Sequence, residues 1–277
     1  MMKPVKRYLS LLVLLLPAVF LNGCEEETTW PLHTEKGDLL VVQGMLTNEL
    51  KSHAVILSRA CATPSGTPQP VSGAAVTLTD GSHVWKLQEQ DTLAGTYLTP
   101  PMQGVLGRTY TLRISSGGRD YSATASLVPV TPLEPLRYHA VVNDGDTLYV
   151  LDYTESNIPA MTEVRADWSR VPGYDTLPAT QTHAVMYCYT LNNVDPNALF
   201  PPAQEEVALP AGTLLVRRKY SLAPAYREYL RTLLSETAWR GSIFDVQPGN
   251  VNSNLTEGAT GFFAVCTVTE ERTIFLP

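Results

Sequence analysis

Cys24 has the most definite chemical setting in the sequence. Three basic residues lie within the first seven positions, and an apolar run from Leu9 to Phe20 follows them. That run is shorter than the roughly 20 apolar residues that span a bilayer, and it has the length of the apolar region of a secretory signal. It leads into Leu21-Asn22-Gly23-Cys24, so a thiol, which can be converted into a thioether, lies at the end of the signal.

This ending resembles the lipobox of bacterial lipoproteins. The resemblance implies cleavage before Cys24, with residues 1–23 as the signal peptide and residues 24–37 as a polar tether; an ordinary signal peptide with a chance cysteine is the alternative. Acyl chains, at about 0.8 kcal/mol per buried CH₂, anchor a protein firmly when two or more are present. The run Glu25-Glu26-Glu27 resembles the acidic segment of surface-exported Bacteroidota lipoproteins, or it is a solvated spacer. We expect a lipid anchor in the outer membrane, at the cell surface or, alternatively, on the periplasmic face.

Motifs for catalysis or metal binding are missing from the rest of the sequence. The five histidines lack the spacing that presents two ligands to one metal ion. There is no GxSxG, Walker or GxGxxG motif. The segment 143–146 (Asn-Asp-Gly-Asp) favours a hairpin turn over a calcium loop, because the remaining spaced acids are missing. We predict no metal, no cofactor and no enzymatic activity, although dispersed carboxylates could converge in the fold.

Three cysteines follow Cys24 in the sequence. Cys188 and Cys266 lie in strand-like runs and could be paired across strands, whereas Cys61 precedes a loop rich in Pro, Ser and Gly. The alternative that we favour is that they are free cysteines that pack as small apolar residues.

The charge of the chain argues against nucleic acid as a partner. The chain has 20 basic and 27 acidic residues, and without residues 1–23 the balance is 17 to 27, a net charge of −10. Arg217-Arg218-Lys219 is the one basic cluster after the signal. We interpret it as a solvated strand face whose aliphatic stems cover apolar surface. A polar contact with a partner protein is a second, weaker hypothesis for the same residues.

The tripeptide Asp-Thr-Leu occurs three times, with its threonine at Thr92, Thr147 and Thr176. It is similar to the short acceptor of O-glycosylation in exported Bacteroidota proteins. Because three-residue motifs often arise by chance, modification of these threonines is a hypothesis.

The elements that must position these residues are mainly β-strands. Short runs rich in Val, Thr and Tyr alternate with turns over residues 38–130, the pattern of an immunoglobulin-like sandwich, and the run 70–114 resembles transthyretin-like modules. Asp80-Gly81 predicts a two-residue hairpin turn that pairs Val76 with Trp85. Gly44 predicts a bulge or a close approach within a strand.

A proline-rich segment, residues 128–135, indicates a boundary before a second β-rich domain, residues 131–277. This domain contains one amphipathic helix, predicted at residues 222–237, with Ser221 as N-cap and with its aromatic side chains covering a sheet. The closing segment, residues 261–276, is predicted to be one long strand or a hairpin.

Several segments together resemble a family of Bacteroidota lipoproteins, domain of unknown function 4249. They are LLVVQGMLTNE, HAVILSR, PVSGAAVTLTDG, GRTYTLRI, KYSLAPAYREYLRTL and GSIFDVQPGNVNSNLTEGATGFFAV. The chain departs from the family at Ser253, where a glycine is more usual before the Asn. The resemblance implies an outer-membrane lipoprotein, often encoded beside TonB-dependent transporters, and it carries over no catalytic or binding residue.

Three functions are compatible with these observations. The leading hypothesis is a non-enzymatic binding or accessory lipoprotein, working with a TonB-dependent transporter in nutrient uptake. The second is a structural or adhesin-like surface subunit whose sheet edges pair with other chains. The third is a lipoprotein hydrolase with convergent carboxylates.

Overall fold

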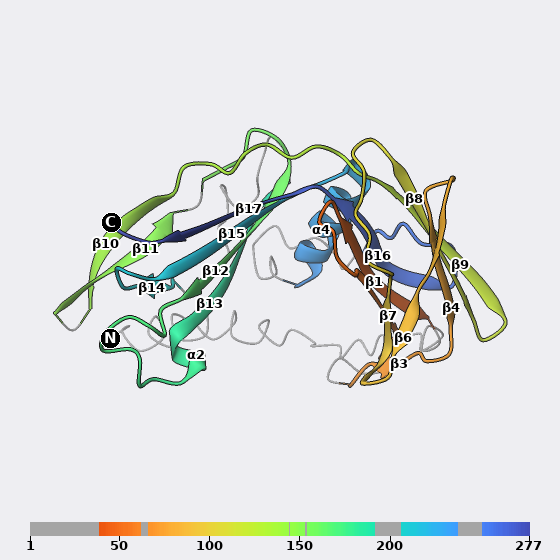
Figure 1. The fold of residues 1–277 in the computed structure, drawn as a ribbon, viewed down its shortest axis with the longest axis horizontal. Helices are drawn as coiled ribbons and strands as arrows, with labels where there is room; N and C mark the ends of the chain where they lie inside the picture. Colours follow the sequence, from red (N-terminus) through yellow and green to blue (C-terminus); the bar gives the residue numbers. More distant parts are fainter. Residues whose placement is uncertain (1–38, 62–65, 144, 153, 192–205, 238–250) are drawn as a thin grey trace, which may run out of the picture. The chain divides into compact units, whose positions relative to one another are not determined.

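The computed structural model describes residues 39–61, 66–143, 145–152, 154–191, 206–237 and 251–277 (Figure 1). This part of the chain is mainly β, as predicted, and its strands form four sheets. The strands are β1 (Leu40–Thr47), β2 (Ala54–Arg59), β3 (Gln69–Pro70), β4 (Ala75–Thr79), β5 (Val84–Lys86), β6 (Gln88–Gln90), β7 (Leu93–Leu98), β8 (Thr109–Ser116), β9 (Arg119–Ser126), β10 (Arg137–Asn143), β11 (Asp146–Asp152), β12 (Ala160–Asp167), β13 (His183–Thr190), β14 (Ala208–Leu209), β15 (Leu214–Ser221), β16 (Ala259–Cys266) and β17 (Val268–Ile274). The helices are α2 (Ala179–Thr182) and α4 (Pro224–Thr237).

Two of the sheets enclose one apolar core, and we call them the N-terminal sandwich. Their strand orders are β16-β1-β2-β7-β6, with β3 beside β2, and β5-β4-β8-β9. Alternate side chains of the longer strands enter the core, as Tyr110, Leu112 and Ile114 of β8 do. This period of two is the pattern that predicted a sandwich from the sequence.

The hairpin between β4 and β5 differs from the prediction by two residues. Thr79 pairs with Val84 and Leu78 with Trp85, so the loop has four residues instead of two. The Asp80 carboxylate accepts hydrogen bonds from the backbone N–H groups of Ser82 and His83, 2.9 and 2.8 Å, and these bonds stabilise the longer loop. Because a shift of two preserves the alternation of faces, the apolar side chains still point to the core.

Strand β16 comes from the far end of the chain but belongs to the N-terminal sandwich. It pairs in parallel with β1, from Leu40 opposite Ala259 to Thr47 opposite Cys266. The prediction assigned residues 131–277, and with them β16, to the second domain. For this strand the predicted boundary is wrong, because β16 pairs with β1. Gly44 is a close-approach point, since an added Cβ would lie 3.2 Å from Val55 and 3.3 Å from Phe263.

The other two sheets form the C-terminal sandwich. Their strand orders are β10-β11-β14 and β13-β12-β15-β17. Val164 and Ala166 of β12 and Leu215 of β15 pack in one cluster with Leu209 of β14, so the inner face of the four-stranded sheet is buried by the three-stranded one.

Helix α4 begins at Pro224, two residues later than predicted. Proline suits the first helical position because its missing N–H would have no partner there. Ser221 is not the N-cap; it is the last residue of β15, and its hydroxyl accepts a hydrogen bond from the N–H of Thr267 at 2.9 Å. As predicted, the helix covers a sheet, with the rings of Tyr226 and Tyr229 5.0 and 4.8 Å from that of Phe262 in β16.

Strand β16 belongs to the N-terminal sandwich and β17 to the C-terminal sandwich, and Thr267 alone separates them (Figure 1). The predicted single strand or hairpin is therefore wrong: the chain crosses from one sandwich to the other at Thr267, which we call the crossing. The side chain of Asn48 fastens this crossing, because its Oδ1 accepts from the N–H of Val268 at 2.7 Å and its amide donates to the carbonyl of the same residue at 3.4 Å. The hydroxyl of Thr267 donates to the carbonyl of Val128 at 2.7 Å. Side-chain hydrogen bonds thus link both sandwiches at the crossing.

Candidate functional site

Cys24, the signal peptide and the tether lie outside the described residues. Within the described part of the chain, no helix is long and apolar enough to cross a membrane. Lipidation at Cys24 therefore stays a prediction from the sequence.

Arg217 and Lys219, predicted to lie on a solvated strand face, are buried, and that prediction is wrong for both. They lie on the inner face of β15, where Lys219 is 0% exposed and Arg217 7% exposed. The Nζ of Lys219 donates to Thr131 Oγ1 and Glu134 Oε1, both at 2.6 Å, and Arg217 donates to Glu271 at 2.9 Å. Side chains so buried and paired cannot contact a partner protein, so these two residues are removed from the predicted partner contact.

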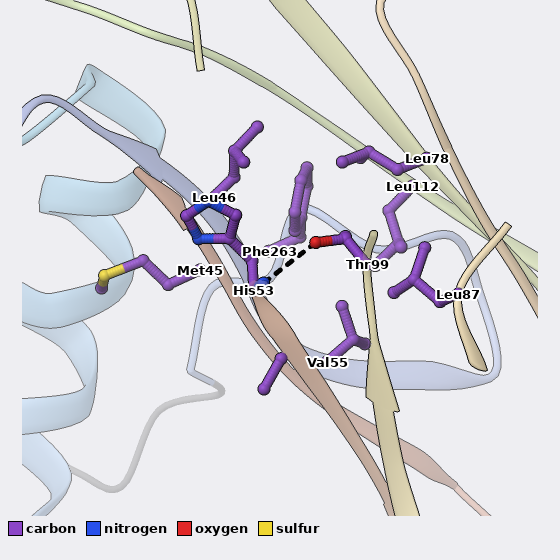
Figure 2. Close-up of a pocket in the computed structure, with 10 residues that line it drawn as sticks. Met45, Leu46, His53, Val55, Leu78, Leu87, Thr99, Leu112 and Phe263 are labelled. Atoms are coloured by element: carbon purple, nitrogen blue, oxygen red, sulfur yellow. Dashed lines mark hydrogen bonds between the residues drawn. The ribbon is translucent and has the colours of Figure 1, made fainter. Parts of the chain in front are cut away.

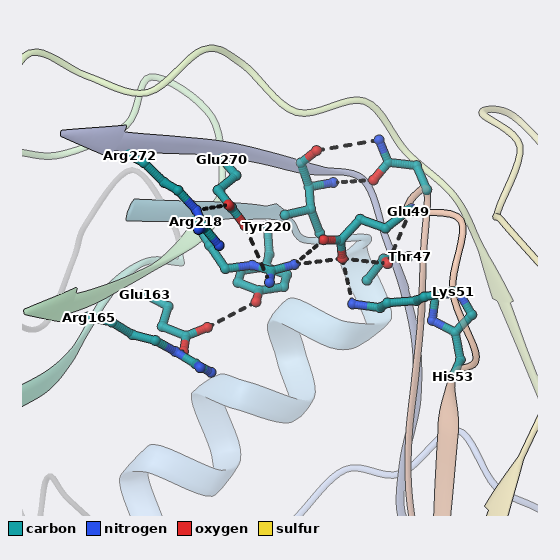
Figure 3. Close-up of polar contacts among 12 residues, drawn as sticks. Thr47, Glu49, Lys51, His53, Glu163, Arg165, Arg218, Tyr220, Glu270 and Arg272 are labelled. Carbon is teal, nitrogen blue, oxygen red and sulfur yellow. Dashed lines mark hydrogen bonds and ion pairs between the residues drawn. The ribbon is translucent and has the colours of Figure 1, made fainter. Parts of the chain in front are cut away.

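Arg218 points to the opposite face of β15, and it joins the two sandwiches (Figure 3). Its guanidinium lies 2.6 Å from the carboxylate of Glu49, which follows β1, and 3.5 Å from that of Glu270 in β17. It also lies over the ring of Tyr220, 5.6 Å from the centroid. Arg218 is half-buried, and its charge is matched within the chain, so a role in partner binding has no support from its surroundings.

The charged groups around Arg218, with the Tyr220 hydroxyl, form a row that runs over the outer face of the four-stranded sheet and ends at Glu49 and Lys51 after β1; we call it the ionic row (Figure 3). Its members are Arg165, Glu163, Tyr220, Arg218, Glu49, Lys51, Glu270 and Arg272. Cross-strand pairing places Glu163 beside Arg218 and Arg218 beside Glu270. Opposite charges on facing positions of neighbouring strands stabilise a sheet.

The carboxylates of the ionic row are held by hydrogen bonds. Glu163 is 3% exposed, accepts from the Tyr220 hydroxyl at 2.9 Å and pairs with Arg165. Burial, together with the hydrogen bond to Glu163, raises the pKa of Tyr220 well above its usual value. Burial raises the pKa of Glu49, but the hydrogen bonds from Lys51 and Thr47 and the nearby Arg218 outweigh it, so the net pKa is lowered.

This geometry favours a clamp over an acid or base. A general acid would need a carboxyl with a raised pKa, whereas Glu49 is held ionised by its neighbours. No local pattern in the sequence indicates the row, because Arg218 and Glu49 are separated by 169 positions. What it could show was the alternation along β15, which places Arg218 on one face and its two neighbours on the other.

Strand β13 forms the edge of the same sheet beside the ionic row. Val185 and Tyr187 are 54% and 44% exposed, and they stand beside Arg165 and Glu163 of β12. We call the segment 184–188 of this strand the open edge. Sequence reasoning missed it as a site, although its lack of charge is visible in the residues HAVMYCYT.

A serine, an aspartate and a histidine meet at the start of β13, an arrangement different from the convergent carboxylates of the hydrolase hypothesis. The hydroxyl of Ser169 donates to Asp167 Oδ1 at 2.7 Å, and His183 Nε2 lies 3.3 Å from the same oxygen. In a catalytic triad the serine donates to the histidine, which takes its proton. Here the aspartate lies between them, and its two hydrogen bonds from Ser169 lower its pKa, so the cluster is a turn-stabilising arrangement.

His53 lies in the N-terminal sandwich beside a cavity of about 10 Å³ (Figure 2). Its backbone N–H donates to Thr99 Oγ1 at 2.9 Å and its Nε2 lies 3.0 Å from the carbonyl of Met102. Burial lowers the pKa of this histidine, so the neutral imidazole is favoured. The cavity is lined by apolar side chains such as Leu78, and it has room for about one water molecule.

The described cysteines are free: Cys61 is exposed, Cys188 intermediate and Cys266 buried. The pairing of Cys188 with Cys266 is therefore not formed. The favoured alternative, free cysteines that pack as small apolar residues, is confirmed for Cys266 and is wrong for Cys61, which is exposed. Burial raises the pKa of the Cys188 thiol to about 11, although Arg217 lowers it, and burial raises that of Cys266 to about 12. Both thiols are therefore poor nucleophiles at neutral pH.

The other predicted positions lie on the surface. Thr92, Thr147 and Thr176 are exposed, as an acceptor of glycosylation must be, and their modification stays a prediction. Strands β10 and β11 pair antiparallel with Asn143 opposite Asp146, so the predicted hairpin is confirmed. Within the described residues, no three His, Cys, Asp or Glu side chains come close enough to hold a metal ion.

Comparison with known proteins identifies the family. The model of DUF4249, a domain of unknown function, matches residues 25–272. No curated protein matches the chain. A similar solved structure, the crystal structure of chicken CNTN1 FN1-FN3 domains, has 8% sequence identity and a TM-score of 0.29, and the match covers 66% of this chain and 61% of that one. Because the family model spans most of its length, the chain belongs to the DUF4249 family.

Proposed function

We propose that this DUF4249 protein is a lipid-anchored, non-enzymatic binding or accessory component of the bacterial outer membrane. The anchor is Cys24, and its support is the order of basic residues, apolar run and cysteine at the start of the sequence. We further propose that the folded part faces the cell surface and works beside a TonB-dependent transporter in nutrient uptake.

The observation that carries an accessory role is the clamp between the sandwiches. The Arg218–Glu49 contact and the Asn48–Val268 hydrogen bonds tie together two bodies that already share the crossing at Thr267. Inter-domain motion is the default for modules joined only by a linker. Tied modules behave instead as one rigid scaffold, which suits the presentation of surfaces to a partner.

Fractionation of the native host tests the anchor. Wild-type protein should partition with the outer membrane, and Cys24→Ser should keep its signal and lose firm attachment. Cys61→Ser is the matched control, because it removes an exposed thiol of the folded part. Equal membrane retention and identical N-terminal processing of Cys24→Ser would refute the anchor.

Mild detergent extraction tests the partner. A tagged wild-type chain should co-purify a TonB-dependent transporter, and cells that lack the chain should take up that transporter's substrate more slowly. Recovery of the folded, membrane-bound chain without any transporter, together with unchanged uptake, would refute the accessory role. Protease treatment of intact cells tests the face: protection of the folded part would assign it to the periplasm.

A further inference from the structure

The open edge of β13 differs from the other long edge of its sheet. Among the described residues, the segment 184–188 of β13 pairs with β12 and with no other strand (Figure 1). At the opposite edge, β17 carries Glu270, Glu271 and Arg272 in succession. Charges on an edge strand discourage pairing with another chain. From residue 184 to residue 188, β13 has no charge and no proline.

The open edge also exposes two large apolar side chains on one face. Val185 is 54% exposed and Tyr187 44% exposed, and they are two positions apart, so both point the same way. On the inner face, Ala184 and Met186 pack against the core of the C-terminal sandwich. An incoming segment must therefore satisfy backbone groups along the edge and cover apolar side chains on its outer face.

A strand in extended conformation meets both requirements, because its N–H and C=O groups alternate with the spacing of the edge. We propose that this strand is β13 of a second copy of the chain, paired antiparallel about a two-fold axis at Met186. The proposal does not depend on the proposed membrane function.

The register follows from matching the exposed side chains. With Met186 opposite its own counterpart, Val185 faces Tyr187 of the second copy, and Tyr187 faces Val185. Pairs of an aromatic with a β-branched side chain are favourable across antiparallel strands. On the inner face, Ala184 faces Cys188 of the second copy, and these two small apolar side chains fit opposite each other.

Charge supports a second copy as the occupant. Two copies of this acidic chain repel each other wherever acidic surfaces meet, and the open edge is a segment that brings no charge of its own. The nearest charges, Arg165 and Glu163 on β12, already neutralise each other. One added strand pair is a small interface, so we expect a weak dimer, with dissociation in the micromolar range or above.

Cysteine cross-linking tests the register. An equimolar mixture of full-length Val185→Cys and Tyr187→Cys chains, each with Cys61→Ser and a different tag, is oxidised under mild conditions. The mixed disulfide should form several times faster than either like-with-like disulfide. Like positions are offset along the strands by about 7 Å, beyond the reach of an unstrained disulfide. The Cys61→Ser protein without new cysteines reports the background from the other thiols.

Sedimentation of the purified full chain tests the dimer itself. The weight-average mass of the wild type should rise towards twice the monomer as concentration increases, and Tyr187→Lys should remain monomeric. Ile274→Lys is the matched control, because Ile274 is 52% exposed on β17 at the other edge of the same sheet. It should dimerise as the wild type does.

Two results overturn the proposal. One is a folded wild type that stays monomeric, together with Val185→Cys and Tyr187→Cys chains that give no mixed disulfide above background, which would leave the edge to a strand of another protein. The other is dimerisation that Tyr187→Lys and Ile274→Lys affect equally, which would move the interface away from β13. Faster like-with-like cross-linking would refute the register at Met186.

Discussion

Removing Glu134 should destabilise the chain more than removing its partner, Lys219. The ammonium of Lys219 is 0% exposed, and it binds Glu134 Oε1 and Thr131 Oγ1 at 2.6 Å and the carbonyl of Pro132 at 3.0 Å. Glu134→Ala leaves this charge buried with two neutral acceptors. Breaking a buried ion pair in this way costs about 3–5 kcal/mol. Because the neutral acceptors remain, we expect about 3 kcal/mol, the lower end of that range.

Lys219→Met leaves the carboxylate of Glu134 without its ion-pair partner. The side chain of Glu134 is 18% exposed, so its carboxylate can regain water, and the methionine fills much of the space of the lysine stem. We expect this variant to lose about 1 kcal/mol, since an apolar replacement of a buried ion often costs little. The double variant should then be more stable than Glu134→Ala alone, because it no longer contains the unpaired ammonium.

Urea denaturation, followed by the fluorescence of the buried Trp168 in the same sandwich, measures these differences. Glu228→Ala is the control, since the Glu228–Arg231 pair is exposed and contributes at most about 0.5 kcal/mol. An equal loss of stability in Lys219→Met and Glu134→Ala, or a double variant that recovers no stability, would show that an unpaired buried ammonium is not the cause.

Three further changes test other parts of the scaffold. Gly261→Ala should lower the free energy of unfolding by at least about 3 kcal/mol or prevent folding, because Gly261 has φ +92° and an added Cβ would lie 2.1 Å from the carbonyl oxygen of Val42. Circular dichroism and urea denaturation measure this loss, and a variant as stable as the wild type would contradict the parallel pairing of β1 with β16. Lowering the pH from roughly 7 to 5 should destabilise the wild type more than it destabilises His53→Gln. Burial lowers the pKa of His53 in the folded chain, so the unfolded chain binds the proton first. Equal dependence of the free energy of unfolding on pH in both proteins would refute this. Asn48→Ala should cost about 2 kcal/mol by leaving a buried backbone N–H without its acceptor, and Asn48→Asp, which keeps the acceptor, should cost less.

Local patterns predicted local structure well. Alternation of apolar and polar residues identified strands such as β8, because burial of one sheet face imposes a period of two. The apolar spacing of Tyr226, Tyr229 and Leu230 identified helix α4 for a similar reason. The hairpin at Asp80 was recognised, but its length was not, since an Asp-Gly pair fits both a two-residue turn and a loop closed by the aspartate side chain.

The contacts between residues far apart in the chain could not be predicted from local sequence patterns. The side chain of Asn48 meets Val268 across 220 positions, and no local signal announces that β16 joins the first sheet. The same limit applies to Arg218 and Lys219. Alternation showed that they point to opposite faces, but which face is buried depends on Glu134, which is 85 positions from Lys219.

The charges of β17 serve two purposes, and together they define how the four-stranded sheet can associate. Glu270 neutralises Arg218 in the ionic row, and Glu271 neutralises the buried Arg217, so both acids are needed inside the chain. The same run of charges makes β17 a poor edge for pairing. Of the two edges that this sheet has in the described part of the chain, the β13 edge is then the one suited to a second strand. Pairing of like edges about a two-fold axis closes at two copies, whereas an adhesin-like polymer through this sheet would need both edges. The distribution of charge therefore favours a closed dimer over a fibre.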